Sequence, residues 1–149
     1  MTAWFDQRAM QAGGLTPEQT RKVKAIEAAL GRSDRVLRDN LISINTFDRS
    51  ARKGKTRSVM AEWPRRIKGL QTETLAARGR LDRLNTGLRA QRVLSAALAE
   101  LASAFGAWHL GLSSTDIEVI EKARVGMKTH YANAGRLGKS GLADLKAGR

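Results

Sequence analysis

The run from residue 49 to residue 68 is the part of the sequence whose residue types could bind a charged ligand. It reads RSARKGKTRSVMAEWPRRIK and holds eight basic residues but a single acid, Glu62. An Arg side chain can donate two parallel hydrogen bonds to one phosphate, and Lys brings a compact mobile charge. Trp63 could stack on a base, or it could belong to the core. The candidate nucleic-acid contacts are Arg49, Arg52, Lys53, Lys55, Arg57, Trp63, Arg65, Arg66 and Lys68.

The net charge of the chain is concentrated around this run. The 149 residues include 27 Lys and Arg against 14 Asp and Glu, which gives a formal charge of +13. Eleven of the basic residues but only four of the acids fall between residues 32 and 72. Such an asymmetry is typical of proteins that bind an acidic polymer, most often nucleic acid. The alternative interpretation is a solvated basic loop without a ligand.

Residues suited to catalysis or metal binding are few. The chain has no Cys, and His109 and His130 stand far apart, so neither a thiolate site nor a His-based metal centre is expected. Residues 138–140 read Gly-Lys-Ser like the end of a phosphate loop, but Asn133 stands where that loop needs Gly. The carboxylates are not clustered as a metal-dependent nuclease requires. We therefore expect no enzyme activity, no catalytic residue, no metal and no cofactor.

The elements that would position the basic run are helices. The chain holds 22 Ala and 17 Leu but only two Pro, and no stretch shows the apolar–polar alternation of a strand. The composition predicts an all-α bundle of four to five helices with a basic connecting segment. Residues 1–131 would form one domain. Residues 132–149 are rich in Gly and predict a flexible, basic C-terminal tail.

Capping signals predict where the first helices begin and end. Thr16, Pro17 and Gln19 have the pattern of a capping box, and Gly31 is a natural end for that helix. Ser33 or Asp34 can cap a second helix. The next helix should begin at Pro64, because proline suits the first helical position and disfavours helix in the residue before it.

Apolar spacing predicts the longer helices. Apolar residues recur every three or four positions from Ile67 to Trp108, with a break at residues 85–87 and an end at Gly111. Ser114 or Thr115 should cap a last helix.

The N-terminal Trp4 and Phe5 are the candidate partner interface, because a bundle of this size could bury its other apolar residues internally. Both could equally cap the bundle. Charges interrupt every apolar stretch before it reaches the roughly 18 residues of a membrane helix, and the start of the chain lacks the pattern of a signal peptide. We expect no membrane partner and a cytoplasmic protein.

In size, charge, lack of Cys and helical layout, with the basic run from Arg49 to Lys68, the chain resembles the small helical subunits of CRISPR effector complexes. This resemblance covers the architecture and no diagnostic motif. It implies a non-enzymatic subunit that steadies guide RNA or target strand beside other protein subunits, including copies of itself. The expected partner is RNA or single-stranded DNA, bound with little sequence preference. The alternative is a structural or adaptor protein that binds other proteins, as in a virion or secretion component.

Overall fold

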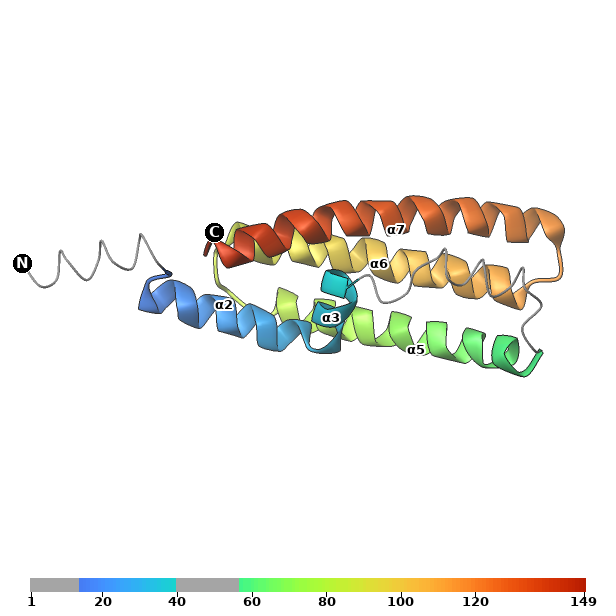
Figure 1. The fold of residues 1–149 in the computed structure, drawn as a ribbon, viewed down its shortest axis with the longest axis horizontal. Helices are drawn as coiled ribbons and strands as arrows, with labels where there is room; N and C mark the ends of the chain where they lie inside the picture. Colours follow the sequence, from blue (N-terminus) through green and yellow to red (C-terminus); the bar gives the residue numbers. More distant parts are fainter. Residues whose placement is uncertain (1–13, 40–56) are drawn as a thin grey trace, which may run out of the picture.

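The described residues form a bundle of five α-helices. The structure, a computed structural model, describes residues 14–39 and 57–149, and the side chains within those ranges except at residues 39 and 57–63. In these ranges there is no strand, so the all-α prediction is confirmed. The helices are α2 (Pro17–Leu30), α3 (Arg32–Asp39), α5 (Arg57–Asp82), α6 (Arg89–Ser113) and α7 (Ile117–Lys146) (Figure 1).

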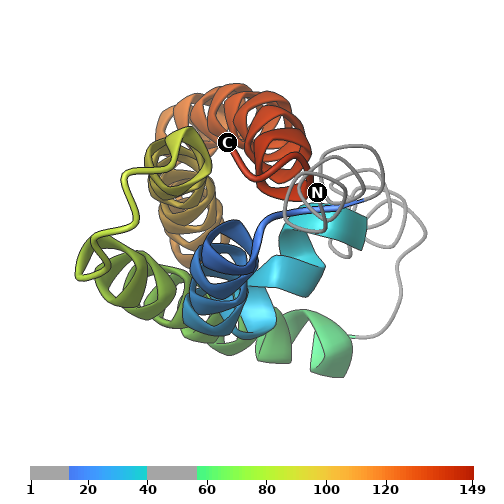
Figure 2. The same ribbon diagram turned by 90° about the vertical axis from the view of Figure 1, so that its left-hand side faces the viewer.

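The central helix is α6, with α7 packed on one side and α5 on the other. Seen from the end, α2 lies against α5, and α3 bridges α5 and α7 (Figure 2). Contrary to the expectation above, α6 is long and apolar enough by length and composition to cross a membrane, the one helix of the described residues for which this holds. Nine residues of α6, among them Leu94, Leu98 and Phe105, are buried between the helices.

The predicted apolar spacing is confirmed along α5 and α6. Two groups of buried residues meet on α6, one toward α2 and the other toward the α6–α7 turn. Fully buried members include Ile26, Leu81, Leu94, Leu98 and Phe105. Ile117, the first residue of α7, is a large apolar residue outside this core and is 76% exposed.

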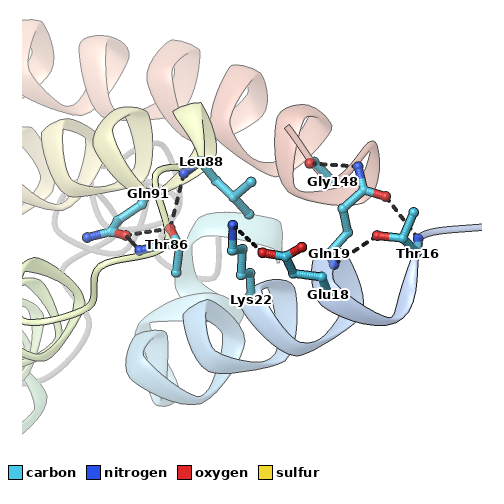
Figure 3. Close-up of polar contacts among 8 residues, drawn as sticks. All are labelled: Thr16, Glu18, Gln19, Lys22, Thr86, Leu88, Gln91 and Gly148. Carbon is cyan, nitrogen blue, oxygen red and sulfur yellow. Dashed lines mark hydrogen bonds and ion pairs between the residues drawn. The ribbon is translucent and has the colours of Figure 1, made fainter.

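The start of α2 is fixed by the predicted capping box. The Gln19 backbone N–H donates to Thr16 Oγ1 at 3.1 Å, and the Thr16 N–H donates to Gln19 Oε1 at 2.9 Å (Figure 3). Gln19 Nε2 also donates to the Gly148 carbonyl at 3.3 Å, which joins the start of α2 to the C-terminal end of the chain. The helix ends at Gly31 with a φ of 53°, a conformation that favours glycine.

The connection between α5 and α6 is held by one side chain, that of Gln91. Its Nε2 donates to the carbonyls of Leu81 and Leu84, at 3.0 and 2.8 Å. Its Oε1 accepts from the Thr86 N–H at 3.1 Å and from the Thr86 hydroxyl at 2.5 Å (Figure 3). Gln91 is therefore a second donor to the Leu81 carbonyl, which also accepts from the Leu84 N–H at 3.1 Å, and a donor to the Leu84 carbonyl just beyond the end of α5.

Three predicted helix starts are wrong. α3 begins at Arg32, directly after Gly31, and α5 begins at Arg57 and contains Pro64 in its interior. A proline inside a helix loses one hydrogen bond, a cost that the packed remainder of α5 offsets. The last helix is capped by Asp116, whose carboxylate accepts from the Glu118 N–H at 2.9 Å.

The prediction of a tail from residue 132 is also wrong, because α7 continues without interruption to Lys146. Two of the glycines that suggested a tail are contact points. Gly138 packs against Leu37 of α3, and Gly141 packs against Leu94 of α6. Leu145 and Asp144 are buried near the end of the helix. Tertiary packing therefore overrides the low helix propensity of glycine in this segment.

Candidate nucleic-acid interface

The outer face of α7 is a strongly basic surface. Beyond Glu121, eleven residues of α7 up to Lys146 are exposed, at the spacing of three and four that marks one helix face. They are Lys122, Val125, Lys128, Thr129, Ala132, Gly135, Arg136, Lys139, Ser140, Ala143 and Lys146. Five are cations, none is an acid, and all the others are small. We call these eleven residues the α7 basic face.

The rotation of α7 about its axis is set by its buried side. Ala123, Met127, Ala134 and Leu145 lie in the core, and Gly111 of α6 approaches Ala123 closely. Because these contacts fix the helix, the basic face must point outward. Figures 1 and 2 show α7 at the edge of the bundle, and no other described helix covers its outer side.

Acids are absent from the exposed residues of α7 beyond Glu121. Asp144 is the one acid of α7 after Glu121, and it is buried, with Arg89 Nε 3.5 Å from Oδ2 and Arg149 Nη2 3.3 Å from Oδ1. None of the five cations forms an ion pair with a described residue. From Lys122 to Lys146 the face runs for about 36 Å at the 1.5 Å rise of an α-helix.

The candidate contacts predicted from the sequence are only partly within the described residues. Arg49, Arg52, Lys53 and Lys55 lie outside them, as do the partner-interface residues Trp4 and Phe5. The side chains of Arg57 and Trp63 are also outside the described set, although both residues belong to α5.

Three candidates on α5 can be placed. Arg65 and Lys68 are exposed and three positions apart, so they share one face of the helix, and Arg66 lies about 100° around it. They do not stand at a helix start as expected, because Arg65 is the ninth residue of α5. The expected repulsion by the helix dipole therefore does not apply to them. Since α5 and α7 pack on different sides of α6, these cations are separate from the α7 basic face.

Several other arginines, which the sequence predicts to be solvated, are exposed and also make specific contacts. Arg78 lies 3.7 Å from Asp82, and Arg80 Nε donates to the Ala29 carbonyl at 3.0 Å. With the pairing of Arg89 to Asp144, these contacts give the arginines near the α5–α6 connection a structural role beside their exposure to solvent.

The other side chains considered for catalysis, metal binding or phosphate binding do not come together into a site within the described residues. Among residues 14–39 and 57–149, no three His, Asp or Glu side chains come close enough to hold a metal ion. Nδ1 of His130 lies 2.6 Å from Glu100 Oε2 across the α6–α7 interface. Residues 138–140, which resembled part of a phosphate loop, lie within α7 and form no loop.

An apolar cavity of about 200 Å³ lies between the end of α6 and the start of α7. Its walls include Trp108, Leu112, Ile120 and Met127. The exposed Ile117 lies at the same end of the bundle. This cavity is the apolar feature that could receive a side chain of another protein.

Comparison of the chain with protein-family models, curated proteins and solved structures finds no match.

Proposed function

We propose that this protein is a non-enzymatic, helical subunit of a nucleoprotein assembly that binds the backbone of nucleic acid. The observation that carries the proposal is the α7 basic face, where five cations project from one helix with no acid among them. Phosphates attract such an array and release condensed counterions on binding. The run from Arg49 to Lys68 would add further contacts. We expect the protein to act in the cytoplasm.

Binding should depend little on base sequence. Base edges are read by Arg or Lys at guanine, by Asn or Gln at adenine and by acidic side chains at cytosine. The α7 basic face has no Asn, Gln or acidic side chain, and we expect its four lysines and Arg136 to contact phosphates. Lysine contacts to phosphate position a protein without reading bases. The small subunits of CRISPR effector complexes give one setting for such binding, which the all-α bundle supports in architecture alone.

A titration of labelled nucleic acid with the full chain tests the proposal. If all five cations meet phosphates of a duplex, the logarithm of affinity should fall with the logarithm of salt with a slope of about −4.5. Replacing Lys128, Lys139 and Lys146 by Gln should flatten that slope by about 2.7. A matched variant replaces Lys24, Arg83 and Arg92, which are exposed cations of other segments, and should change the slope much less.

The outcomes discriminate between the proposal and its rival. An unchanged slope in the α7 variant would remove the α7 basic face from the interface. Absence of binding at low salt would leave the adaptor function. The apolar cavity beside Trp108 favours that second candidate, because a cavity of about 200 Å³ can accept one large apolar side chain of a partner protein.

A further inference from the structure

The cations of the α7 basic face form two rows. Lys128, Lys139 and Lys146 are separated by eleven and seven residues, and these intervals return to the same side of a helix within about 20°. Lys122 and Arg136 lie about 60–120° around the helix from that row. The two rows therefore border a strip of the helix surface instead of following a single line.

The strip between the rows carries only small side chains. Val125, Ala132 and Ala143 fall along its middle, within about 20° of one another. No long side chain holds a ligand away from the helix there, so a ligand flanked by the lysines can approach the backbone of α7 closely. The helix itself has no described neighbour on this side.

These dimensions correspond to one kind of nucleic acid. An α-helix with its side chains is about 10–12 Å wide, and the major groove of B-form DNA is about 12 Å wide with phosphates along both edges. The major groove of an RNA duplex is too narrow and deep for such entry. A helix with cations on its two flanks and small residues between them can therefore meet the phosphates of both DNA strands.

A single strand fits the described surface less well. Proteins that hold single strands add affinity by stacking bases on exposed aromatic rings. The described residues contain three aromatic side chains, and none is exposed: Phe105 and Trp108 are buried, and Tyr131 is partly buried. The α7 basic face thus offers charge without a stacking surface.

We infer that the protein binds B-form duplex DNA by placing the middle of α7 in the major groove, with the two rows of cations on the phosphates of opposite strands. The inference rests on the proposed function and names its ligand. The segment from Lys128 to Lys139, about 16 Å long, would lie deepest in the groove. Lys122 and Lys146 would reach phosphates to either side.

The test compares three labelled nucleic-acid probes of one sequence, each 16 nucleotides long per strand: a DNA duplex, an RNA duplex and single-stranded DNA. At equal salt, the full chain should bind the DNA duplex about tenfold or more tightly than either other probe, because only this duplex admits the helix. Replacing Lys128, Lys139 and Lys146 by Gln should abolish this preference. The variant with Gln at positions 24, 83 and 92 should keep it.

A variant without a change of charge separates groove entry from general attraction. Ala132→Phe places a bulky side chain in the strip and should lower affinity for the DNA duplex about fivefold or more, with affinity for single-stranded DNA nearly unchanged. Ala96→Phe, at an exposed position of α6, is its control and should change neither. Circular dichroism would show that both variants keep their helix content.

The failure of this inference differs from the failure of the proposed function. Equal or tighter binding of single-stranded DNA or RNA duplex, or an Ala132→Phe variant that binds the DNA duplex normally, would overturn the major-groove inference and leave backbone binding intact. No binding of any of the three probes at low salt would overturn both.

Discussion

Gly141 of α7 lies so close to Leu94 of α6 that a Cβ at position 141 would be 2.7 Å from Leu94 Cγ and 3.3 Å from the Leu94 backbone nitrogen. The two helices meet here backbone to side chain, with no room for a methyl group. The contact fixes the distance between α6 and the C-terminal half of α7, and it fixes the rotation of α7 about its own axis there. The orientation of Lys139 and Lys146 toward solvent depends on that rotation.

Gly141→Ala should therefore destabilise the protein, although alanine favours helix. We expect a loss of about 1–3 kcal/mol in the free energy of unfolding, because Leu94 must leave its position to admit the new Cβ. Gly135→Ala is the matched control on the same helix, where a Cβ meets nothing within 4 Å. It should stabilise by up to about 1 kcal/mol. Urea titrations of both variants give the comparison, and equal effects would contradict the close contact.

The start of α2 and the length of α7 differ in how far the sequence predicts them. The start of α2 was predictable, because Thr16 and Gln19 satisfy each other locally and need no other part of the chain. The C-terminal half of α7 was not. Its glycines have low helix propensity, and the contacts that compensate come from Leu37 and Leu94, which are distant in sequence.

Gln91 provides a second test of the packing. Gln91→Ala should lower the free energy of unfolding by about 2–3 kcal/mol, because the Leu84 carbonyl and the N–H and hydroxyl of Thr86 lose a partner and the Leu81 carbonyl loses one of its two donors. Arg92→Ala, at the exposed neighbouring position, should change stability by no more than about 0.5 kcal/mol. Thermal unfolding measures both, and a Gln91 variant as stable as wild type would contradict the role of this side chain.

Pro64→Ala should stabilise α5. Proline in a helix interior costs up to about 3 kcal/mol relative to alanine, since its ring displaces the carbonyl four residues earlier and removes an N–H donor. If α5 instead began at Pro64, as the sequence suggests, alanine would bring little gain. The midpoint of urea unfolding distinguishes the two arrangements, and a rise in the midpoint supports the helix that begins at Arg57.

The basic face of α7 could have been found from the sequence only with the correct helix boundary. A window along the chain detects the dense run of residues 49–68, but the cations of α7 are spread over 25 residues. They form one surface because helical spacing brings every third or fourth residue to the same side. If residues 132–146 are interpreted as a flexible tail, helical spacing is not applied to them, and the basic face cannot be recognised from the sequence.

The burial of Tyr131 leads to a prediction about the stability of the bundle at high pH. Burial raises the pKa of its phenol above the ordinary value of about 10, since the charged form loses hydration. The unfolded state then loses this proton at lower pH than the folded state, so stability should fall as pH rises above about 10. It is the one tyrosine of the chain, so absorbance at the phenolate band reports it directly. Titration at the ordinary pKa in the folded protein would contradict its burial.

The basic run from residue 49 to residue 68 supplies the last prediction. Replacing Arg52, Lys53, Lys55 and Arg57 by Gln should weaken binding to all nucleic-acid sequences alike and reduce the magnitude of the salt slope, because each phosphate contact contributes about 0.7–0.9 to it. Arginines 78, 80 and 89 are unsuitable controls, because they bind Asp82, the Ala29 carbonyl and Asp144. The variant with Gln at positions 24, 83 and 92 serves instead.

If this run and the α7 basic face contact the same nucleic acid, combining their substitutions should reduce the magnitude of the slope by the sum of the two separate reductions. Distant sites of this kind are expected to be additive. If the run is a solvated loop, its variant should keep the wild-type slope, and the combined variant should match the α7 variant alone. A strong preference for one short sequence over its scramble would contradict backbone binding by either surface, since lysine contacts to phosphate carry no sequence information.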